Sequence, residues 1–116
     1  MSCKRFLLAC DASSIILLQK VDLLKDISSG CDLFVTPMIR SELFKGASKG
    51  DAKEIKRHTI LIDPSETRDN FIAHTLTPAD ASVLFLYNHT KSNAVLSDDQ
   101  AILKYCRSKN IEHYCC

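Results

Sequence analysis

The sequence contains no tryptophan, only three glycines and three prolines, and no long hydrophobic run. The scarcity of glycine and proline predicts short connections and excludes a collagen-like or low-complexity chain. The longest apolar stretches, residues 6–10 and 15–18, are too short to cross a bilayer, and Asp11 interrupts the first one too early for a signal sequence. We therefore expect a cytoplasmic protein with no membrane partner.

The chain also lacks an excess of charge of either sign. Its 15 basic and 14 acidic residues leave a net charge of +1, which excludes a basic field over the whole surface. Any nucleic acid would have to be held by a local basic patch or through metal ions. The length of 116 residues, 46% of them hydrophobic, predicts one globular domain spanning residues 1–116.

Cysteine is present, but not in the arrangement of a metal site. No two cysteines form a C-x-x-C pair, and no cysteine–histidine spacing resembles a zinc site. We interpret the cysteines as small, buried apolar residues in a reducing compartment. They are Cys3, Cys10, Cys31, Cys106, Cys115 and Cys116.

Strand-like and helix-like segments alternate along the chain. The apolar run at 5–10 predicts a strand buried on both faces, and further strands are predicted over 33–36, 59–62, 94–96 and 111–115. Helices are predicted over 11–18, 21–27, 38–44, 51–57, 65–74, 77–89 and 97–109. This alternation predicts an α/β fold with a mainly parallel sheet.

Carboxylates follow the predicted strands. Asp11 ends the first strand, Glu42 lies one helical turn beyond the second, and Asp98 and Asp99 follow the strand at 94–96, while Asp80 begins the helix before that strand. Sites in parallel sheets form beyond the carboxyl ends of the strands, so these acids are expected to meet. Clustered carboxylates need a counter-ion, and hard oxygen ligands suit Mg²⁺ or Mn²⁺. Each acid is equally suited to be a helix N-cap.

Four ordered motifs resemble the PIN-domain family, in particular its VapC-like metal-dependent ribonucleases. Residues 6–15 resemble the family's apolar strand followed by D-x-[NS], and residues 35–43 its strand, proline and helix bearing E-L. Residues 76–84 resemble its third motif, an Asp at the start of an apolar helix, and residues 95–102 its [ST]-x-D motif. The resemblance covers nearly the whole chain.

The resemblance implies a three-layer α/β/α sandwich and an RNA-cleaving site that leaves 5′-phosphate and 3′-hydroxyl ends. Its implied acids are Asp11, Glu42, Asp80 and Asp99, which would hold one or two Mg²⁺ or Mn²⁺ ions. Asp98 is a fifth candidate, although the motif places the ligand at Asp99. Ser13 and Ser97 occupy the positions of hydroxyl residues that assist the site, and they are equally suited to be helix caps.

Basic residues after Glu42 are candidates for holding the substrate. Their three- and four-residue spacing predicts one basic helix face, which either binds phosphates or is simply solvated. Arg40 precedes Glu42 by two residues and is a candidate partner of a site acid or of a phosphate. The face consists of Lys49, Lys53, Lys56 and Arg57.

Several alternative functions remain at this point. A receiver-like domain would need a lysine after a late strand, and a dinucleotide-binding domain a glycine-rich turn after the first strand; neither is present. A non-catalytic PIN-like module that binds RNA or protein is disfavoured by the presence of all four acids. Among nucleases, the small size favours a toxin with an antitoxin partner over a housekeeping RNA-processing or decay enzyme, and the resemblance suggests a homodimer.

Overall fold

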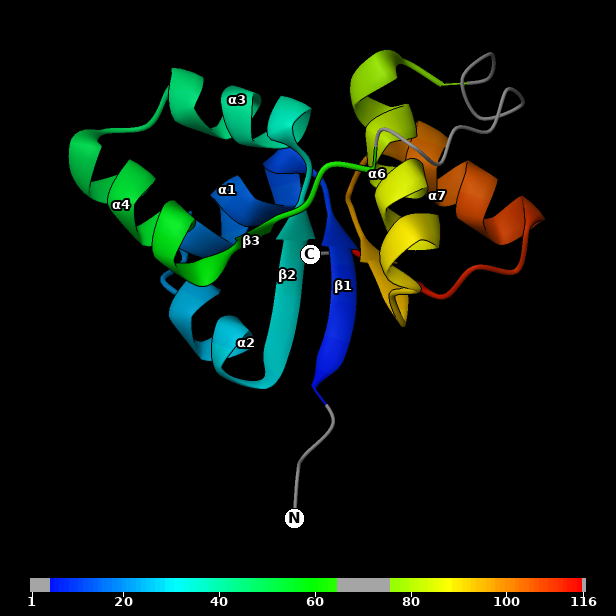
Figure 1. Ribbon diagram of the computed structural model, residues 1–116, viewed down its shortest axis with the longest axis horizontal. Coiled ribbons are helices and arrows are strands. Elements are labelled where there is room, and N and C mark those ends of the chain that lie inside the picture. Colours follow the sequence, from blue (N-terminus) through cyan, green and yellow to red (C-terminus); the bar gives the residue numbers. More distant parts are fainter. Residues whose placement is uncertain (1–4, 65–75, 116) are drawn as a thin grey trace.

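A parallel β-sheet forms the centre of the protein. The computed structural model describes residues 5–64 and 76–115 (Figure 1). Within them all strands are parallel, in the order β3-β2-β1-β4-β5, which confirms the predicted α/β class. The strands are β1 (Phe6–Cys10), β2 (Cys31–Val35), β3 (Ile60–Leu61), β4 (Ala94–Leu96) and β5 (His113–Tyr114).

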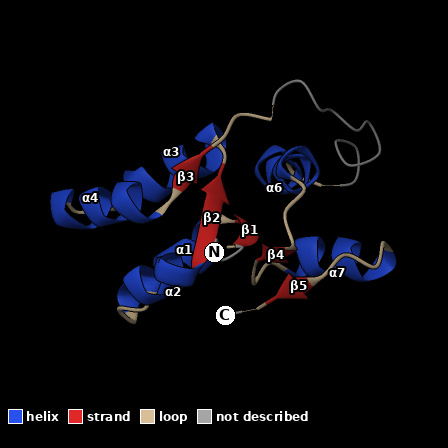
Figure 2. Ribbon diagram, turned by 60° about the horizontal axis from the view of Figure 1, so that its bottom comes forward, coloured by secondary structure: helices blue, strands red, loops and turns tan. Residues whose placement is uncertain are grey.

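Helices cover both faces of the sheet and produce the expected three layers. One face is covered by α1 (Ala12–Lys20), α2 (Leu24–Gly30) and α4 (Lys49–His58), and the other by α6 (Pro78–Thr90) and α7 (Gln100–Ser108) (Figure 2). The remaining described helix, α3 (Pro37–Lys45), contacts both α1 and α6. It therefore connects the two helical layers at the carboxyl ends of the strands.

Two predicted boundaries around α2 were wrong. The helix begins at Leu24 rather than at residue 21, because Val21 closes α1 and Asp22 then takes a left-handed backbone conformation with φ of 61°. Strand β2 follows at residue 31 rather than at 33. Here the Arg5 guanidinium donates to the carbonyls of residues 28, 29 and 31 and pairs with Asp32 at 2.5 Å. These bonds bring the start of β2 alongside the start of β1.

Burial agrees with the sequence pattern over most of the sheet. All three residues of β4 are buried, as expected for a strand with helices on both sides, but Phe6 at the start of β1 is 37% exposed. The prediction that the first strand is buried on both faces along its whole length was therefore wrong. The predicted helix over 65–74 lies outside the described residues. No helix in the described part of the chain has the length and apolarity needed to span a membrane.

The described cysteines lie in different surroundings. Cys10 and Cys106 are buried, as predicted, and burial raises the pKa of the Cys106 thiol to about 11. Cys31 is partly buried. Cys115 is exposed, so the prediction of burial was wrong for this residue. It follows β5, which lies at the edge of the sheet and leaves the chain end outside the core.

Lys91 closes α6 in a left-handed conformation, with φ of 52°. Glycine adopts this conformation without the steric cost of a Cβ atom, so we expect Lys91→Gly to stabilise the protein by about 0.5–1 kcal/mol. Urea unfolding measures the change. The matched control is Lys53→Gly, in the exposed interior of α4, which should destabilise by about 1 kcal/mol. Equal losses in both variants would contradict the argument.

Candidate active site

Four carboxylates come from the loops and helices that follow or adjoin the carboxyl ends of the parallel strands, and β1 and β2 run toward the top of Figure 1. Asp11 directly follows β1 and begins α1, and Asp99 follows β4 and begins α7. Glu42 lies in α3, which begins directly after β2, and Asp80 lies in the first turn of α6. The parallel sheet thus brings together acids that are far apart in the sequence.

Asp11 is the most buried of these acids, at 5% exposure. Its Oδ1 accepts a hydrogen bond from the Ser14 backbone N–H at 2.9 Å, and its Oδ2 accepts one from the Ser97 hydroxyl at 2.5 Å. Its own N–H donates to the Leu96 carbonyl. The first two bonds provide a hydrogen-bond donor for each oxygen of this buried carboxylate.

Ser97 links the ends of β1 and β4. Its side chain is fully buried, and its oxygen accepts a hydrogen bond from the Asp99 N–H at 3.0 Å while its hydroxyl donates to Asp11. One hydroxyl group therefore sets the position of Asp11 relative to the backbone of Asp99. The capping role expected as one alternative for Ser97 was wrong, because Asp99 is the N-cap of α7, and the Ser97 hydroxyl instead joins two elements.

The two neighbouring acids, Asp98 and Asp99, have different surroundings. Asp99 is the N-cap of α7, and its Oδ1 accepts from the N–H groups of Ala101 at 2.9 Å and Ile102 at 3.3 Å. Asp98 is exposed and accepts a 2.5 Å hydrogen bond from the hydroxyl of Ser13, which lies 3.3 Å from Asp11 Oδ2. Asp98 thus lies at the outer rim of the cluster, with Ser13 between it and Asp11.

The pKa of Asp80 shows the influence of the other three acids. Its pKa is raised above the ordinary value of 3.8, first by partial burial and then by the negative charge of Asp99. Asp11 and Glu42 raise this pKa further, and a hydrogen bond with Thr77 partly opposes the shift. Like charges held close together disfavour ionisation, so the raised pKa of Asp80 is the electrostatic signature of a carboxylate cluster.

The donor set of this cluster suits a hard divalent cation, because it consists only of carboxylate and hydroxyl oxygens. A cation would also relieve the repulsion that raises the pKa of Asp80. Across residues 5–64 and 76–115, however, no three His, Cys, Asp or Glu side chains form a ready-made ion site. The cluster fits such an ion in its chemistry and charge but is more open than a closed structural site.

A pair of hydroxyl groups that the sequence analysis did not identify connects two helices of the site. Thr36, the N-cap of α3, lies 3.0 Å from the Ser82 hydroxyl oxygen of α6. The Ser82 hydroxyl also bonds to the Ala79 carbonyl at 2.7 Å. This link fixes α3, which carries Glu42, against α6, which carries Asp80. A local sequence pattern reveals the Thr36 cap but cannot reveal its partner 46 residues away.

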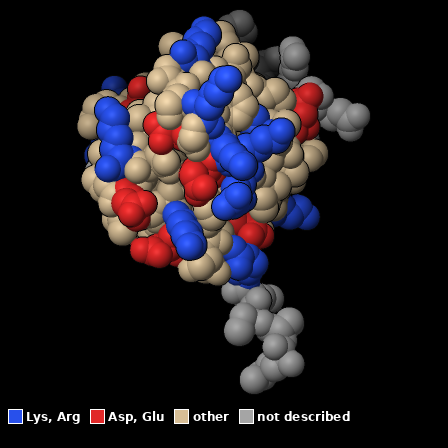
Figure 3. Space-filling view, turned by 90° about the vertical axis from the view of Figure 1, so that its left-hand side faces the viewer, with Lys and Arg blue, Asp and Glu red and all other residues tan. Residues whose placement is uncertain are grey.

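The predicted basic face lies on α4, where all four of its side chains are exposed (Figure 3). The structure does not bring the whole face to the acids. Arg57 borders a cavity of about 210 Å³ that also involves Arg5 and Ile60, at the amino-terminal ends of β1 and β3. Asp11 and Asp99 lie at the opposite, carboxyl-terminal ends of the strands.

Arg40 also does not pair with a site acid among the described residues. Its guanidinium lies 5.9 Å from the centre of the Phe44 ring, and its buried Nε has no hydrogen-bond partner in this part of the chain. Positions 40 and 44 share one side of α3, whereas position 42 is displaced by about 160–200° around the helix. The structure therefore places Arg40 and Glu42 on different flanks of α3.

Removing the charge of Asp80 should stabilise the metal-free protein. In EDTA we expect Asp80→Asn to raise the melting temperature, because the variant loses both the burial cost and the repulsion from the other acids. The raised pKa means that this cost is present above the folded-state pKa and disappears below the unfolded value of 3.8. The difference between parent and variant should therefore shrink as the pH falls toward that value.

The control for this measurement is Glu112→Gln, which removes an exposed carboxylate outside the cluster. It should leave the melting temperature nearly unchanged. A lower melting temperature for Asp80→Asn at neutral pH in EDTA would show that repulsion among the four acids does not limit stability.

Comparison with known families agrees with this arrangement. The model of the family DUF3368, described as a PIN domain, matches residues 7–114 and so includes all four acids. None of the curated proteins matches the chain in sequence. The fold is accordingly a nuclease fold, and PIN domains are generally hydrolases that use divalent metals. The expected resemblance is confirmed: the chain belongs to the PIN-domain family.

Proposed function

We propose that the protein is a metal-dependent endoribonuclease that hydrolyses RNA phosphodiester bonds at the carboxylate cluster. The observation that carries this proposal is the convergence of Asp11, Glu42, Asp80 and Asp99 at the carboxyl ends of the strands; burial raises the pKa of Asp80, and the charges of the other three acids raise it further. Four carboxylates on separate elements have no stabilising role that would require them to meet. Their convergence favours a site for a cation and, through it, for a phosphate.

In this proposal Asp11 and Asp99 hold Mg²⁺ or Mn²⁺, and Glu42 and Asp80 complete the ligand set. A bound divalent ion supplies an activated water and a counter-charge for the scissile phosphate. Asp98, at the rim, is the alternative fifth ligand. The expected products carry 5′-phosphate and 3′-hydroxyl ends, as the family resemblance implies.

The protein's own groups prepare the site before substrate arrives. Ser97 and the Ser14 N–H fix both oxygens of Asp11 by hydrogen bonds, so that the carboxylate needs little reorganisation. The Thr36–Ser82 contact holds the helices of Glu42 and Asp80 together against their mutual repulsion. Both are positioning contacts, and neither Ser97 nor Thr36 is required to exchange a proton with RNA.

The decisive test is cleavage of a labelled single-stranded RNA with Mg²⁺ or Mn²⁺ and with EDTA. We expect cleavage only with metal, and a loss of about 100-fold or more in Asp11→Asn and Asp99→Asn, because these changes remove charged oxygens from the ion site. The matched control is Asp26→Asn, an exposed acid of α2, which should cleave as the parent does. Equal cleavage by parent and Asp11→Asn would exclude this cluster as the active site.

Ser97 offers a separate test of how Asp11 is positioned. We expect Ser97→Ala to weaken metal binding and cleavage by about 10–100-fold, the usual effect of losing a hydrogen bond to a ligand. Isothermal titration with Mn²⁺ measures the affinity without relying on activity. Ser97→Thr retains the hydroxyl and should recover most of the loss. A full-affinity Ser97→Ala variant would show that its hydrogen bond to Asp11 is unimportant for the metal.

The biological role is a further part of the proposal and rests on the family resemblance. We propose that residues 1–116 form one domain acting in the cytoplasm as the toxin of a toxin–antitoxin pair. Its partners would be RNA, a small antitoxin protein and a second copy of the chain. The alternatives are a housekeeping ribonuclease of RNA processing or decay and a non-catalytic binding module.

Induced expression in a bacterial host separates the toxin role from the alternatives. A toxin should arrest growth when the parent chain is produced and should have no effect as Asp11→Asn at the same protein level. The physical reason is that uncontrolled RNA cleavage depends on the complete cluster. Normal growth with an active, soluble parent would favour the housekeeping role.

A further inference from the structure

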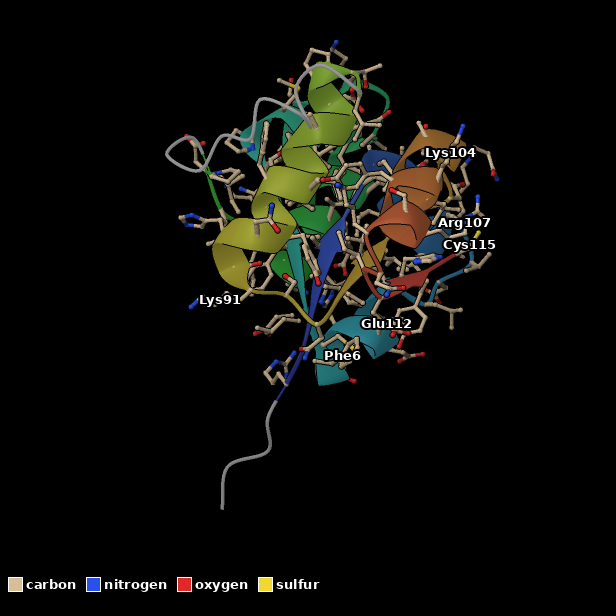
Figure 4. The ribbon with its side chains drawn as sticks, turned by 90° about the vertical axis from the view of Figure 1, so that its right-hand side faces the viewer. Phe6, Lys91, Lys104, Arg107, Glu112 and Cys115 are labelled. Carbon is tan, nitrogen blue, oxygen red and sulfur yellow. The ribbon has the colours of Figure 1, made fainter. Side chains whose placement is uncertain are left out.

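Two cations on α7 lie close in sequence to the candidate active site. Lys104 and Arg107 are three residues apart, and both are exposed on the outer side of the helix (Figure 4). Positions three apart share one helix face, so the two side chains form one short basic strip. The helix begins at Asp99, and the two Cα atoms lie about 7.5 and 12 Å from it along the axis.

The strip carries positive charge that nearby groups do not neutralise. The helix itself contains no acidic residue, and among the described residues neither cation forms an ion pair within 4.0 Å. Arg107 shares the border of a cavity of about 250 Å³ with Glu112, without such a pair. Unpaired surface cations next to an anionic cluster are suited to bind a polyanion that must approach that cluster.

The larger basic face on α4 is less suited to this task. Its helix includes Asp51 and Glu54, and Glu54 contacts Arg57 at 3.5 Å and His58 at 3.1 Å. Arg57 and Arg107 both lie toward the amino-terminal ends of the strands, near the starts of β3 and β5, so the two helices differ in where they begin rather than in where they end. Number of cations therefore favours α4, whereas α7 is favoured because it begins at Asp99, an acid of the cluster, and contains no acidic residue.

We propose that Lys104 and Arg107 bind the phosphates of single-stranded RNA that flank the scissile bond and guide the strand along α7 toward Asp99. The proposal rests on the proposed ribonuclease function and extends it by naming the surface that holds the substrate. The contacts are to the sugar–phosphate backbone, so they supply affinity without reading the base sequence.

The test is fluorescence anisotropy with a labelled single-stranded oligouridylate, in EDTA so that the RNA stays intact, over a series of salt concentrations. We expect Lys104→Gln/Arg107→Gln to raise Kd about tenfold at low salt. Two lost phosphate contacts should also reduce the magnitude of the slope of log K against log salt by about 1.4. The matched control is Lys20→Gln/Lys25→Gln, which removes two exposed cations from the opposite helical layer and should change neither value.

Cleavage with Mn²⁺ supplies a second readout. The α7 double variant should show a raised KM with a nearly unchanged kcat, because the strip holds the substrate but does not touch the reacting atoms. Thermal melting should show the same folded state in all variants, since the changed side chains are exposed.

Several results would overturn the proposal. One is an unchanged Kd and salt slope in Lys104→Gln/Arg107→Gln, and another is a larger loss in Lys53→Gln/Lys56→Gln, which would place the RNA on α4. A parent chain that binds no RNA also overturns it. The proposed function stands or falls separately, on whether metal-dependent cleavage by the parent disappears in Asp11→Asn.

Discussion

Repulsion among carboxylates at one edge of the sheet is the constraint on which the rest of the site depends. Asp11, Glu42, Asp80 and Asp99 come from four elements, and folding forces them together although their charges oppose it. The fold withstands this cost in two ways. Hydrogen bonds from Ser97 and from the Ser14 N–H hold both oxygens of Asp11, and a hydrogen bond with Thr77 partly opposes the rise in the pKa of Asp80 that burial and the neighbouring acids cause. A bound cation would reverse the sign of this interaction and turn an unfavourable cluster into a favourable one.

The same residues serve both the fold and the proposed chemistry. Asp11 and Asp99 are N-caps, and each places a carboxylate oxygen on the first turn of its helix. The Thr36 hydroxyl is an N-cap as well, and its contact with Ser82 sets the spacing between α3 and α6. For Asp11 and Asp99, the choice between a capping role and a site role, which is open from sequence alone, is therefore not a real choice. A cap at the end of a parallel strand fixes the very carboxylate that a cation site needs.

Local patterns predicted what depends on neighbours in sequence. Apolar runs predicted the strands, and acids directly after them predicted which side chains gather at the carboxyl edge. Features that depend on distant contacts were missed or misplaced. Strand β2 begins earlier than predicted because Arg5, which directly precedes β1, pairs with Asp32 of β2. Ser82 was overlooked because its partner Thr36 belongs to another layer of the fold. The residue spacing predicted that four cations share one face of a helix, which α4 provides. The distance of this face from the acids could not be predicted, because it depends on the strand order.

Strand order also explains why a small group of cations can matter more than a larger one. Because β3 and β5 occupy opposite edges of the sheet, α4 and α7 lie at opposite ends of the molecule and on opposite faces (Figure 2). The chain enters α7 directly from the acid cluster through Asp99, whereas it enters α4 only after α3, and both helices then run toward the amino-terminal ends of the strands. A negatively charged site repels RNA at short range, so the most effective cations are those just outside the cluster, close enough to offset this repulsion and too far away to neutralise the ligands. Lys104 and Arg107 lie five and eight residues beyond Asp99 on α7, and for this reason the proposed RNA path follows α7 although the net charge of the chain is only +1.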